Sequence, residues 1–334
     1  MKIVMFEYRQ DLPAELLDRL RAGNEVITTP EPLTIETAPR YADAEVITSF
    51  INSSLGKDTL QFMPKLRLIA LRSAGFDSVD MAYCHAQGIT VCNAAGYGDD
   101  SVAEHAFALL LALSKRIVET ARKTRAGYFG YIPAPGLELF GKVFGVVGTG
   151  RIGRRAASIA KGFGMEVLAY DKYPKPQEAK EIGFQYVALA ELLTRADVVS
   201  LHVPGNPETN GLINDHAFGL MKPGAILINT GRGTVVDTPA LIRALAAGRL
   251  GGAGLDVLPQ EPALRNLTAL FEGKVPFGVN WQDTIAGFTV ARFENVIVTP
   301  HNAYNTIEAD RRLVTIPVDN ILAFLAGKPT NVVS

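Results

Sequence analysis

The chain alternates short apolar runs with longer stretches of helical pattern from its first residues onward. Apolar runs occupy positions 3–6, 26–27, 46–47, 66–71 and 89–91, and helical patterns separate them. Short runs of this kind, spaced by helical segments, are typical of βαβ units and a parallel sheet. Residues 1–98 therefore predict one α/β domain.

The same alternation continues after a long helical segment. Further apolar runs, which we expect to be strands, occupy positions 143–147, 167–170, 198–201, 225–228, 253–255 and 296–298. Helix signals fill the gaps between them, as where Asp237 or Thr238 can cap a helix whose first residue is Pro239. Six strands with helices between them fit a doubly wound dinucleotide-binding sheet.

Two helices are expected to connect these halves. The first follows the S-x-x-E sequence 101–104, which predicts a capping box, and its apolar period reaches about Lys123. We place the first domain crossing near Asp99. The second helix begins at about Thr306 and is predicted to return to the first domain, with a kink or a restart at Pro317.

Composition narrows the class of protein. The 334 residues are 48% hydrophobic and 20% charged, which is typical of a soluble globular protein with two domains. A formal net charge of −1 argues against nucleic-acid binding by bulk electrostatics. The apolar segments 3–6 and 107–113 are shorter than a secretory signal and a membrane span, so we expect a cytoplasmic protein with no membrane partner. Cys84 and Cys92 lack metal or redox spacing, which predicts reduced thiols and no metal site.

A glycine-rich turn follows the apolar run 143–147 and carries the first candidate chemistry. Its sequence is G-T-G-R-I-G, from Gly148 to Gly153, and an Ala-rich helical pattern comes next. In such a turn Gly148 makes the tight bend, Gly150 lets backbone approach a pyrophosphate, and Gly153 lets the helix pack closely on the strand. The free N–H groups at the helix start would then hold the pyrophosphate.

Asp171 ends the next apolar run, 18 residues after Gly153. A carboxylate at this spacing accepts hydrogen bonds from an adenosine ribose and repels a 2′-phosphate, so the sequence favours NAD over NADP. The neighbouring Lys172 weakens that preference, and a polar strand end without a ligand is the alternative interpretation of Asp171.

Five polar residues stand at or just past the carboxyl ends of apolar runs. They are Asp171, His202, Arg232, Asp256 and His301. The carboxyl ends of parallel strands share one edge of a sheet, and a dinucleotide binds at that edge. We therefore expect these residues to line one cleft.

Hydride transfer to a carbonyl needs a group that holds the substrate and an acid/base near neutral pKa. Arg232 stands in the turn 230–233, where its guanidinium could bind a carboxylate bidentately; a surface arginine is the alternative. His301 is the better acid/base among the five histidines, and Glu261 is a natural partner for it. The alternatives are a hydrogen-bonded strand-end histidine and a solvated loop acid.

The other histidines receive lesser roles. His202 is a rival acid/base, although its position in a His-Val-Pro turn favours a backbone role. His85, His105 and His216 fall within helical patterns and are interpreted as structural.

Two further segments are candidates for ligand binding. The turn that follows the run 66–71 contains Ser73, Ala74 and Gly75, whose backbone N–H groups could bind an anion; an ordinary strand-to-helix turn explains it equally well. The stretch 258–292, which holds Trp281, breaks the α/β rhythm and predicts an irregular loop that is functional or mobile.

Taken together, these motifs resemble the D-isomer-specific 2-hydroxyacid dehydrogenases, most closely the D-lactate dehydrogenase branch, over essentially the whole chain. The segments that match, in order, are 71–77, 101–105, 148–153, 201–204, 228–233, 254–257 and 299–303. Segments 96–100 and 258–292 match no single branch clearly. The resemblance implies two doubly wound parallel-sheet domains with a cleft between them: a flavodoxin-like substrate domain, 1–98 and 303–334, and a Rossmann NAD-binding domain, 99–302.

The resemblance also implies roles for individual residues. Arg232 would grip the substrate carboxylate, His301 would exchange the proton, and Glu261 would pair with His301. The implied substrate-binding residues are Ser73, Ala74, Gly75 and Tyr304. The implied NAD-binding residues are Gly148, Gly150, Arg151, Ile152, Gly153, Asp171, His202, Val203, Pro204, Thr209, Thr230, Gly231 and Asp256.

The implied activity is reduction of a small 2-keto acid by NADH, with pyruvate to D-lactate as the first expectation. Alternatives are a D-hydroxyisocaproate type, a phosphoglycerate type, and a non-catalytic NADH-sensing protein of the same fold. A formate dehydrogenase resemblance is weaker, because that branch has glutamine where Glu261 stands. A homodimer formed through the NAD-binding domain, around the helix of Ser101, is also implied.

Overall fold

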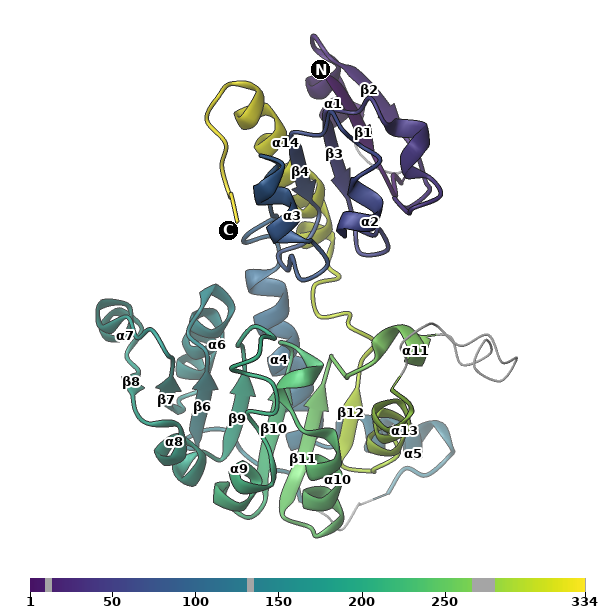
Figure 1. Ribbon diagram of the computed structural model, residues 1–334. Coiled ribbons are helices and arrows are strands. Elements are labelled where there is room, and N and C mark those ends of the chain that lie inside the picture. The colour runs from purple at the N-terminus through teal and green to yellow at the C-terminus, as the bar shows by residue number, and fades with distance from the viewer. Residues whose placement is uncertain (10–13, 131–134, 266–279, 334) are drawn as a thin grey trace. The chain divides into compact units, whose positions relative to one another are not determined.

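The computed structural model describes residues 1–9, 14–130, 135–265 and 280–333. Contacts divide the chain into two compact units: unit 1 is Met1–Gly98 with Asn305–Ser334, and unit 2 is Asp99–Tyr304 (Figure 1). The chain returns from unit 2 to unit 1 after Tyr304, two residues later than the predicted boundary. The reason is that the backbone of Ala303 is bonded within unit 2, where its N–H donates to Asp256 and its carbonyl accepts from Ser101.

Unit 1 is built on a parallel sheet in the order β2-β1-β3-β4-β5. Its strands are β1 (Lys2–Met5), β2 (Glu25–Thr28), β3 (Val46–Ser49), β4 (Leu68–Leu71) and β5 (Thr90–Cys92). Its helices are α1 (Ala14–Arg21), η1 (Ala38–Tyr41), α2 (Lys57–Leu60), α3 (Met81–Ala86) and α14 (Ile307–Leu325).

Alternate side chains of these strands pack on opposite faces of the sheet, as the period of a strand requires. Val4 joins an apolar cluster that includes side chains of α2 and α3, whereas Ile3 and Met5 join a cluster with α1 and α14. Both faces are therefore covered, which explains why the strands are continuous apolar runs.

Unit 2 contains a seven-stranded parallel sheet in the order β12-β11-β10-β9-β6-β7-β8. Its strands are β6 (Val143–Val147), β7 (Glu166–Tyr170), β8 (Gln185–Tyr186), β9 (Val198–Leu201), β10 (Ala225–Asn229), β11 (Leu250–Leu255) and β12 (Val296–Val298). The six predicted strands are present, and β8 is an edge strand of two residues that the apolar pattern did not indicate.

Helices cover both faces of this sheet. They are α4 (Asp99–Ser114), α5 (Ile117–Arg125), α6 (Arg151–Gly162), α7 (Pro176–Ile182), α8 (Leu189–Arg195), α9 (Asp215–Leu220), η2 (Gly233–Val235), α10 (Thr238–Ala246), α11 (Glu261–Arg265) and α13 (Trp281–Val290). One apolar cluster joins the sheet to α8, α9 and α10, and a second joins it to α4 and α6. None of the helices in the described part of the chain is both long and apolar enough to span a membrane.

The expected long helix to Lys123 and its capping box at Ser101 were wrong. Helix α4 already begins at Asp99, and the Ser101 hydroxyl donates to the carbonyl of Ala303 at 2.7 Å instead of capping a helix. The helix ends at Ser114, because Arg116 adopts a left-handed φ of +53° and α5 starts anew. The N–H of Leu137 donates to the Ser114 carbonyl at 2.7 Å, so a later segment satisfies the end of α4.

One other expectation about local structure was also wrong. Residues 281–290, predicted to be part of an irregular loop, form α13, whose N-terminus is capped by the Asn280 side chain accepting from Gln282 and Asp283. Residues 266–279 of the same predicted loop lie outside the described residues. Helix α14 begins after Thr306 as expected, and of the two expectations for the buried Pro317 the structure excludes the restart, while a kink there stays a prediction.

Candidate active site

The glycine turn between β6 and α6 requires glycine at two positions for steric reasons. Gly148 has a φ of +94°, and a Cβ there would lie 2.8 Å from the backbone of His202. A Cβ on Gly153 would lie 1.9 Å from the carbonyl oxygen of Gly148. A Cβ on Gly150 would meet nothing within 4 Å, so the first turn of α6 is open above it. This combination leaves a helix N-terminus accessible to an anion.

The two side chains that follow Gly150 have partners within unit 2. Arg151 donates from Nε to the Asp99 carboxylate at 2.5 Å, and Ile152 packs against the apolar cluster of α4 and α6. The Arg151 side chain is nevertheless 63% exposed, and binding of the cofactor by Arg151 and Ile152 stays a prediction. Arg154, which the sequence did not single out, donates from Nη1 to the Thr149 carbonyl at 2.8 Å and helps to fix the conformation of the turn.

Asp171 follows β7 and faces the same turn. Its Oδ2 accepts from the Thr149 N–H at 2.6 Å and from the Thr149 hydroxyl at 2.9 Å, and its Oδ1 accepts from the Tyr173 N–H at 2.8 Å. Partial burial alone would raise the pKa of Asp171, but the hydrogen bonds from Tyr173 and Thr149 lower it below its ordinary value. A fixed negative charge therefore stands beside the first glycine.

Two adjacent strands end in buried polar atoms that have no hydrogen-bond partner within the described residues. These atoms are Nδ1 of His202, after β9, and Oγ1 of Thr230, after β10. Burial lowers the pKa of His202 to about 4, so its imidazole is neutral at pH 7, with Nε2 placed 2.9 Å from the Ser200 hydroxyl. Leaving a buried polar atom unsatisfied costs about 1–3 kcal/mol, which a polar ligand can recover.

The carboxyl edge of the unit 2 sheet offers groups that can bind a dinucleotide. The opening above Gly150, the anionic Asp171 and the two unsatisfied atoms lie at the carboxyl ends of β6, β7, β9 and β10, the edge where doubly wound sheets bind such a ligand. The N–H groups at the start of α6 suit a pyrophosphate, the Asp171 carboxylate can accept from a ribose, and the two unsatisfied atoms suit polar groups of the ligand, so the residues fit NAD. No group of three or more His, Cys, Asp or Glu side chains suited to a metal ion was found in the described part of the chain.

Arg232 lies in a turn that the end of β10 holds rigidly. The Asn229 side chain accepts from the Gly231 N–H at 3.0 Å and donates to the Arg232 carbonyl at 3.0 Å. Gly233 packs so closely on the Leu258 backbone that a Cβ would lie 2.2 Å from it. The Arg232 guanidinium donates from Nη1 to the Gly231 carbonyl at 3.0 Å.

His301 and Glu261 form a pair at the same edge of the unit 2 sheet. Nδ1 of His301 lies 2.7 Å from Oε2 of Glu261, the first residue of α11. The side chains are 38% and 24% exposed, so the pair is partly desolvated and still reachable. His301 has a left-handed φ of +53°, and its N–H donates to the Asp256 and Thr299 carbonyls at 2.8 and 3.0 Å.

Asp256 holds this strained turn in place. Its buried carboxylate accepts from the N–H groups of Asn302 and Ala303 at 2.8 and 2.9 Å and from the Thr299 hydroxyl at 2.5 Å. His105 of α4 adds a contact, with Nε2 2.9 Å from the Thr299 hydroxyl. The structure thus gives Asp256 a holding role, and direct binding of the cofactor by Asp256 stays a prediction.

Comparison with known proteins identifies the family. Residues 107–303 match the model of the NAD-binding domain of D-isomer specific 2-hydroxyacid dehydrogenases. The chain belongs to this family. It is therefore an NAD-dependent oxidoreductase, and unit 2 contains its NAD-binding domain.

Individual relatives of this dehydrogenase differ in their substrates. A glyoxylate reductase of Thermococcus litoralis is 38% identical over 303 residues, which cover 88% of this chain and 85% of the relative. A glycerate dehydrogenase of Methylorubrum extorquens is 39% identical over 312 residues, covering 91% and 89%. The crystal structure of D-lactate dehydrogenase from Aquifex aeolicus with NAD and lactic acid has a TM-score of 0.85 and 36% identity, covering 97% and 96%.

The remaining predicted cofactor residues of the dehydrogenase belong to the loop after β9. Thr209 donates from its hydroxyl to the Pro204 carbonyl at 2.6 Å, and its N–H donates to the Asn206 side chain at 3.1 Å. Thr209 therefore closes this loop through protein contacts. Val203 contacts the glycine turn, because a Cβ on Gly148 would lie 2.8 Å from Val203 Cγ1.

The predicted substrate residues are divided between the two units. Tyr304 is the last residue of unit 2, whereas Ser73, Ala74 and Gly75 follow β4 in unit 1. The turn 73–75 is held firmly, since the Ser73 hydroxyl donates to the Gly75 carbonyl at 2.6 Å and the Asn93 side chain donates to the Ala74 carbonyl at 2.7 Å.

Sequence reasoning missed three residues that support the site. Arg154 supports it through a local contact with Thr149, whereas Thr299 and His105 support it through contacts between elements far apart in the chain. No spacing rule links His105 of α4 to Thr299 after β12, so only the packing of α4 against the sheet brings the two together.

Proposed function

We propose that this dehydrogenase reduces a small 2-keto acid to the D-2-hydroxy acid, with pyruvate as the first candidate substrate. In this proposal His301 exchanges the proton, Glu261 orients His301, and Arg232 holds the substrate carboxylate. The observation that carries it is the 2.7 Å contact between Nδ1 of His301 and Oε2 of Glu261.

The His301–Glu261 contact suits a general acid. A carboxylate bonded to Nδ1 fixes the tautomer and plane of the ring and directs Nε2 to the opposite side. Protonated at Nε2, the imidazolium can donate its proton to the carbonyl oxygen while the keto carbon accepts a hydride. In the direction of oxidation the neutral ring takes the hydroxyl proton back. Glu261 stabilises the charged form during both events.

Arg232 suits recognition of the carboxylate that every 2-keto acid carries. Its planar guanidinium can donate two parallel hydrogen bonds to a carboxylate, which fixes both position and orientation. The rigid turn built by Asn229 and Gly233 limits the motion of its backbone, so little ordering remains to be done when the substrate arrives.

The cofactor residues proposed for this chain lie around the open glycine turn or carry polar atoms that can still bind a ligand. The backbone around Gly148, Gly150 and Gly153 would hold the pyrophosphate, Asp171 would accept from the adenosine ribose, and His202 and Thr230 would gain partners. When bound, NADH supplies the hydride. We further propose that unit 1 is the substrate domain, with the turn 73–75 contributing backbone donors.

Two relatives favour a second candidate substrate class. The glyoxylate reductase and the glycerate dehydrogenase, each more than 35% identical to this chain, carry names that point to 2-keto acids with a very small or hydroxylated side chain. Reduction of glyoxylate or hydroxypyruvate is therefore the alternative to pyruvate. Both alternatives use the same carboxylate and carbonyl contacts.

The test is a panel of 2-keto acids with NADH and NADPH in parallel, followed by the loss of reduced-nicotinamide absorbance. The panel contains glyoxylate, pyruvate, hydroxypyruvate, 2-oxobutanoate and 4-methyl-2-oxopentanoate. Turnover of pyruvate with NADH at the highest kcat/KM supports the proposal, and a higher value for glyoxylate or hydroxypyruvate selects the alternative. Tight NADH binding without turnover of any keto acid in the panel would contradict the proposed reaction and favour an NADH-sensing role.

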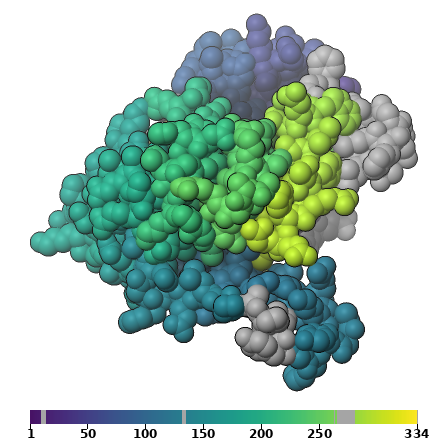
Figure 2. Space-filling view, turned by 90° about the horizontal axis from the view of Figure 1, so that it is seen from below, coloured from purple at the N-terminus to yellow at the C-terminus, as the bar shows by residue number. Residues whose placement is uncertain are grey.

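We also propose that the protein is a homodimer formed through unit 2. Several large apolar side chains on α5 and the segment after it are exposed, including Phe129 at 94% and Phe140 at 80%, and a soluble monomer rarely exposes such a group. In Figure 2 this blue-teal segment projects from the surface of unit 2. Light scattering during gel filtration tests the proposal, and a mass of 36.0 kDa would contradict it.

A further inference from the structure

The strand order of unit 1 marks one place on its sheet as a ligand site. In the order β2-β1-β3-β4-β5 the direction of progression reverses between β1 and β3. Sheets of this order bind ligands outside the carboxyl ends of the strands at that reversal. The residues that directly follow β1 and β3 are therefore the ones to search, and they include Glu7 and Phe50.

Glu7 binds the whole segment that follows β3. Its Oε2 accepts from the Phe50 N–H at 2.8 Å and from the Ser53 hydroxyl at 2.7 Å. Its Oε1 accepts from the N–H and the side-chain amide of Asn52 at 3.0 and 2.9 Å. Glu7 itself has a left-handed φ of +50°, a conformation that costs energy in a residue other than glycine. One carboxylate thus fixes residues 50–53 (the Phe50 loop) at the reversal point.

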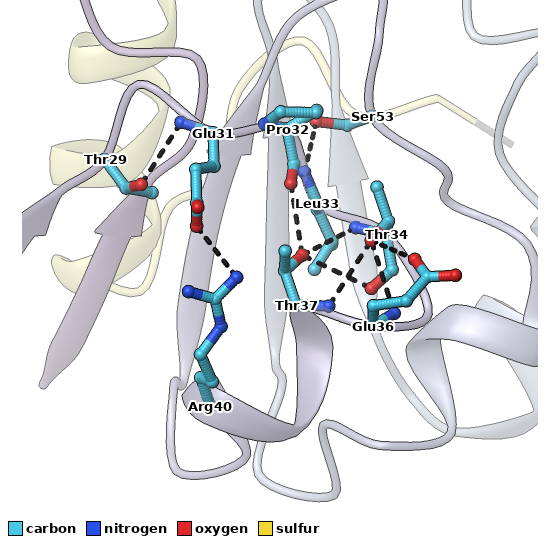
Figure 3. Close-up of polar contacts among 9 residues, drawn as sticks. All are labelled: Thr29, Glu31, Pro32, Leu33, Thr34, Glu36, Thr37, Arg40 and Ser53. Atoms are coloured by element: carbon cyan, nitrogen blue, oxygen red, sulfur yellow. Dashed lines mark hydrogen bonds and ion pairs between the residues drawn. The ribbon is translucent and has the colours of Figure 1, made fainter.

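The Phe50 loop is also bound at its last residue, Ser53. The Ser53 hydroxyl accepts from the Leu33 N–H at 3.0 Å, as Figure 3 shows. The segment that contains Leu33 is itself tied together, since the Thr37 hydroxyl donates to the Pro32 carbonyl at 3.1 Å and Arg40 pairs with Glu31 at 2.8 Å. Ser53 therefore connects the Phe50 loop, which Glu7 fixes, to this hydrogen-bonded segment of unit 1.

A second charged residue holds the ring of Phe50. Arg72 is only 5% exposed, and the central carbon of its guanidinium lies 5.8 Å from the centre of that ring. It also donates to the carbonyls of Phe6 and Glu7 at 2.5 and 3.1 Å. Arg72 leads directly into the turn 73–75, so the Phe50 ring and the proposed substrate turn follow neighbouring strands, β3 and β4.

We propose that Glu7 is a positioning residue that fixes the Phe50 loop and thereby sets how large a carbon chain the 2-keto acid can carry. The proposal rests on the proposed function. The half-buried aromatic ring offers an apolar surface, which suits the hydrocarbon end of a keto acid and not its carboxylate. Glu7 acts only through Phe50 and has no part in proton or hydride transfer.

The experiment compares carboxylates at opposite ends of the same two strands. Glu7→Gln keeps the shape of the side chain and removes one acceptor oxygen. Glu7→Gly removes the carboxylate at a left-handed position that glycine adopts without strain, which protects against a failure to fold. The matched control is Glu45→Gln, because Glu45 precedes β3 and its carboxylate accepts from the N–H of Lys2, the first residue of β1, at 3.2 Å.

Two readouts are needed. The first is hydrogen exchange of the Phe50 and Asn52 amides, which we expect to become about tenfold faster or more in both Glu7 variants and to stay unchanged in Glu45→Gln. The second is the ratio of kcat/KM for pyruvate to that for 4-methyl-2-oxopentanoate. We expect this ratio to fall about fivefold or more in both Glu7 variants, mainly through KM for the larger acid, because discrimination by an apolar pocket depends on where its walls stand.

The results distinguish a failure of the proposal for Glu7 from a failure of the proposed function. If exchange accelerates but both keto acids lose or keep activity by the same factor, Glu7 stabilises unit 1 and the positioning proposal is overturned. Unchanged exchange at Phe50 and Asn52 overturns it as well. If the unaltered enzyme turns over no keto acid at all, the proposed function has failed before any variant is compared, and the proposal for Glu7 falls with it.

Discussion

Nδ1 of His301 lies 2.7 Å from Oε2 of Glu261, although 40 residues separate the two along the chain. The contact joins the turn after β12 to the first residue of α11. His301 reaches it with a left-handed backbone that the carbonyl and the carboxylate of Asp256 hold in place. Backbone strain that surrounding contacts maintain is common at functional sites. Here the strained backbone of His301 places its imidazole against Glu261.

Replacing Glu261 by Gln should mainly lower kcat. The amide keeps the size of the side chain but removes the negative charge that stabilises the imidazolium, and positioned proton transfer contributes about 10²–10⁴-fold to a rate. We expect kcat for pyruvate reduction to fall about a hundredfold, with KM changed less than threefold. Steady-state kinetics with Glu294→Gln as control measures this, because Glu294 is an exposed acid before β12. Equal losses in the two variants would argue against the pairing.

Replacing Arg232 by Ala should mainly weaken capture of the substrate. Loss of a bidentate contact to a carboxylate costs about 2–5 kcal/mol in kcat/KM, and Lys, which cannot form the fork, should recover only part of it. The control is Arg243→Ala, because Arg243 makes two hydrogen bonds to the exposed carboxylate of Asp215 in the same unit. An unchanged kcat/KM in Arg232→Ala would remove Arg232 from the site.

The strands could be predicted because their signal is local. Runs such as 143–147 and 225–229 are buried on both faces, so each is a continuous apolar segment that needs no knowledge of its neighbours. The two-residue edge strand β8 has no such signal. The order of strands that brings Arg232 and His301 to one edge followed from the general rules for parallel sheets.

Features that depend on distant contacts could not be predicted. The end of α4 at Ser114 is satisfied by Leu137, and the hydroxyl of Ser101 binds Ala303 about two hundred residues away, so the local capping pattern was misleading. The same holds for the carboxylate of Glu7, whose four donors come from residues 50–53. Side-chain partners of this kind emerge only from the packed structure.

Gly150→Ala should separate cofactor binding from folding. A Cβ there meets no atom within 4 Å, and the φ of −61° suits alanine, so we expect an unchanged melting temperature. The added methyl would stand over the helix N-terminus that the pyrophosphate needs, so the Kd for NADH should rise about tenfold or more. Titration of NADH fluorescence measures this.

The controls for Gly150 come from the same helix. Gly162→Ala also places its Cβ in open space, at the other end of α6, and should leave the Kd for NADH unchanged. Gly153→Ala should destabilise unit 2, because its Cβ would lie 1.9 Å from the Gly148 carbonyl oxygen. A Kd that is unaltered in Gly150→Ala would show that the pyrophosphate lies elsewhere.

His202 should make stability depend on pH. Burial lowers the pKa of this imidazole to about 4, whereas the unfolded chain has an ordinary value near 6.5. Between these values the unfolded chain binds a proton that the folded protein does not, so stability is full above pH 6.5 and falls as the pH falls toward 4. The loss is about 2–3 kcal/mol at pH 4.5.

The His202→Asn variant should lack this dependence, because its side chain has a similar polar shape and does not titrate. Urea unfolding at pH 7 and pH 4.5 gives the change in the free energy of unfolding, which should be smaller in His202→Asn than in the unaltered protein by about 2–3 kcal/mol. His216→Asn removes an exposed histidine of α9 and should behave like the unaltered protein. If His202→Asn lost as much stability on acidification as His216→Asn, the imidazole would have to be protonated in the folded state. Such a cation at the end of β9 would also restore His202 as a rival proton donor to His301.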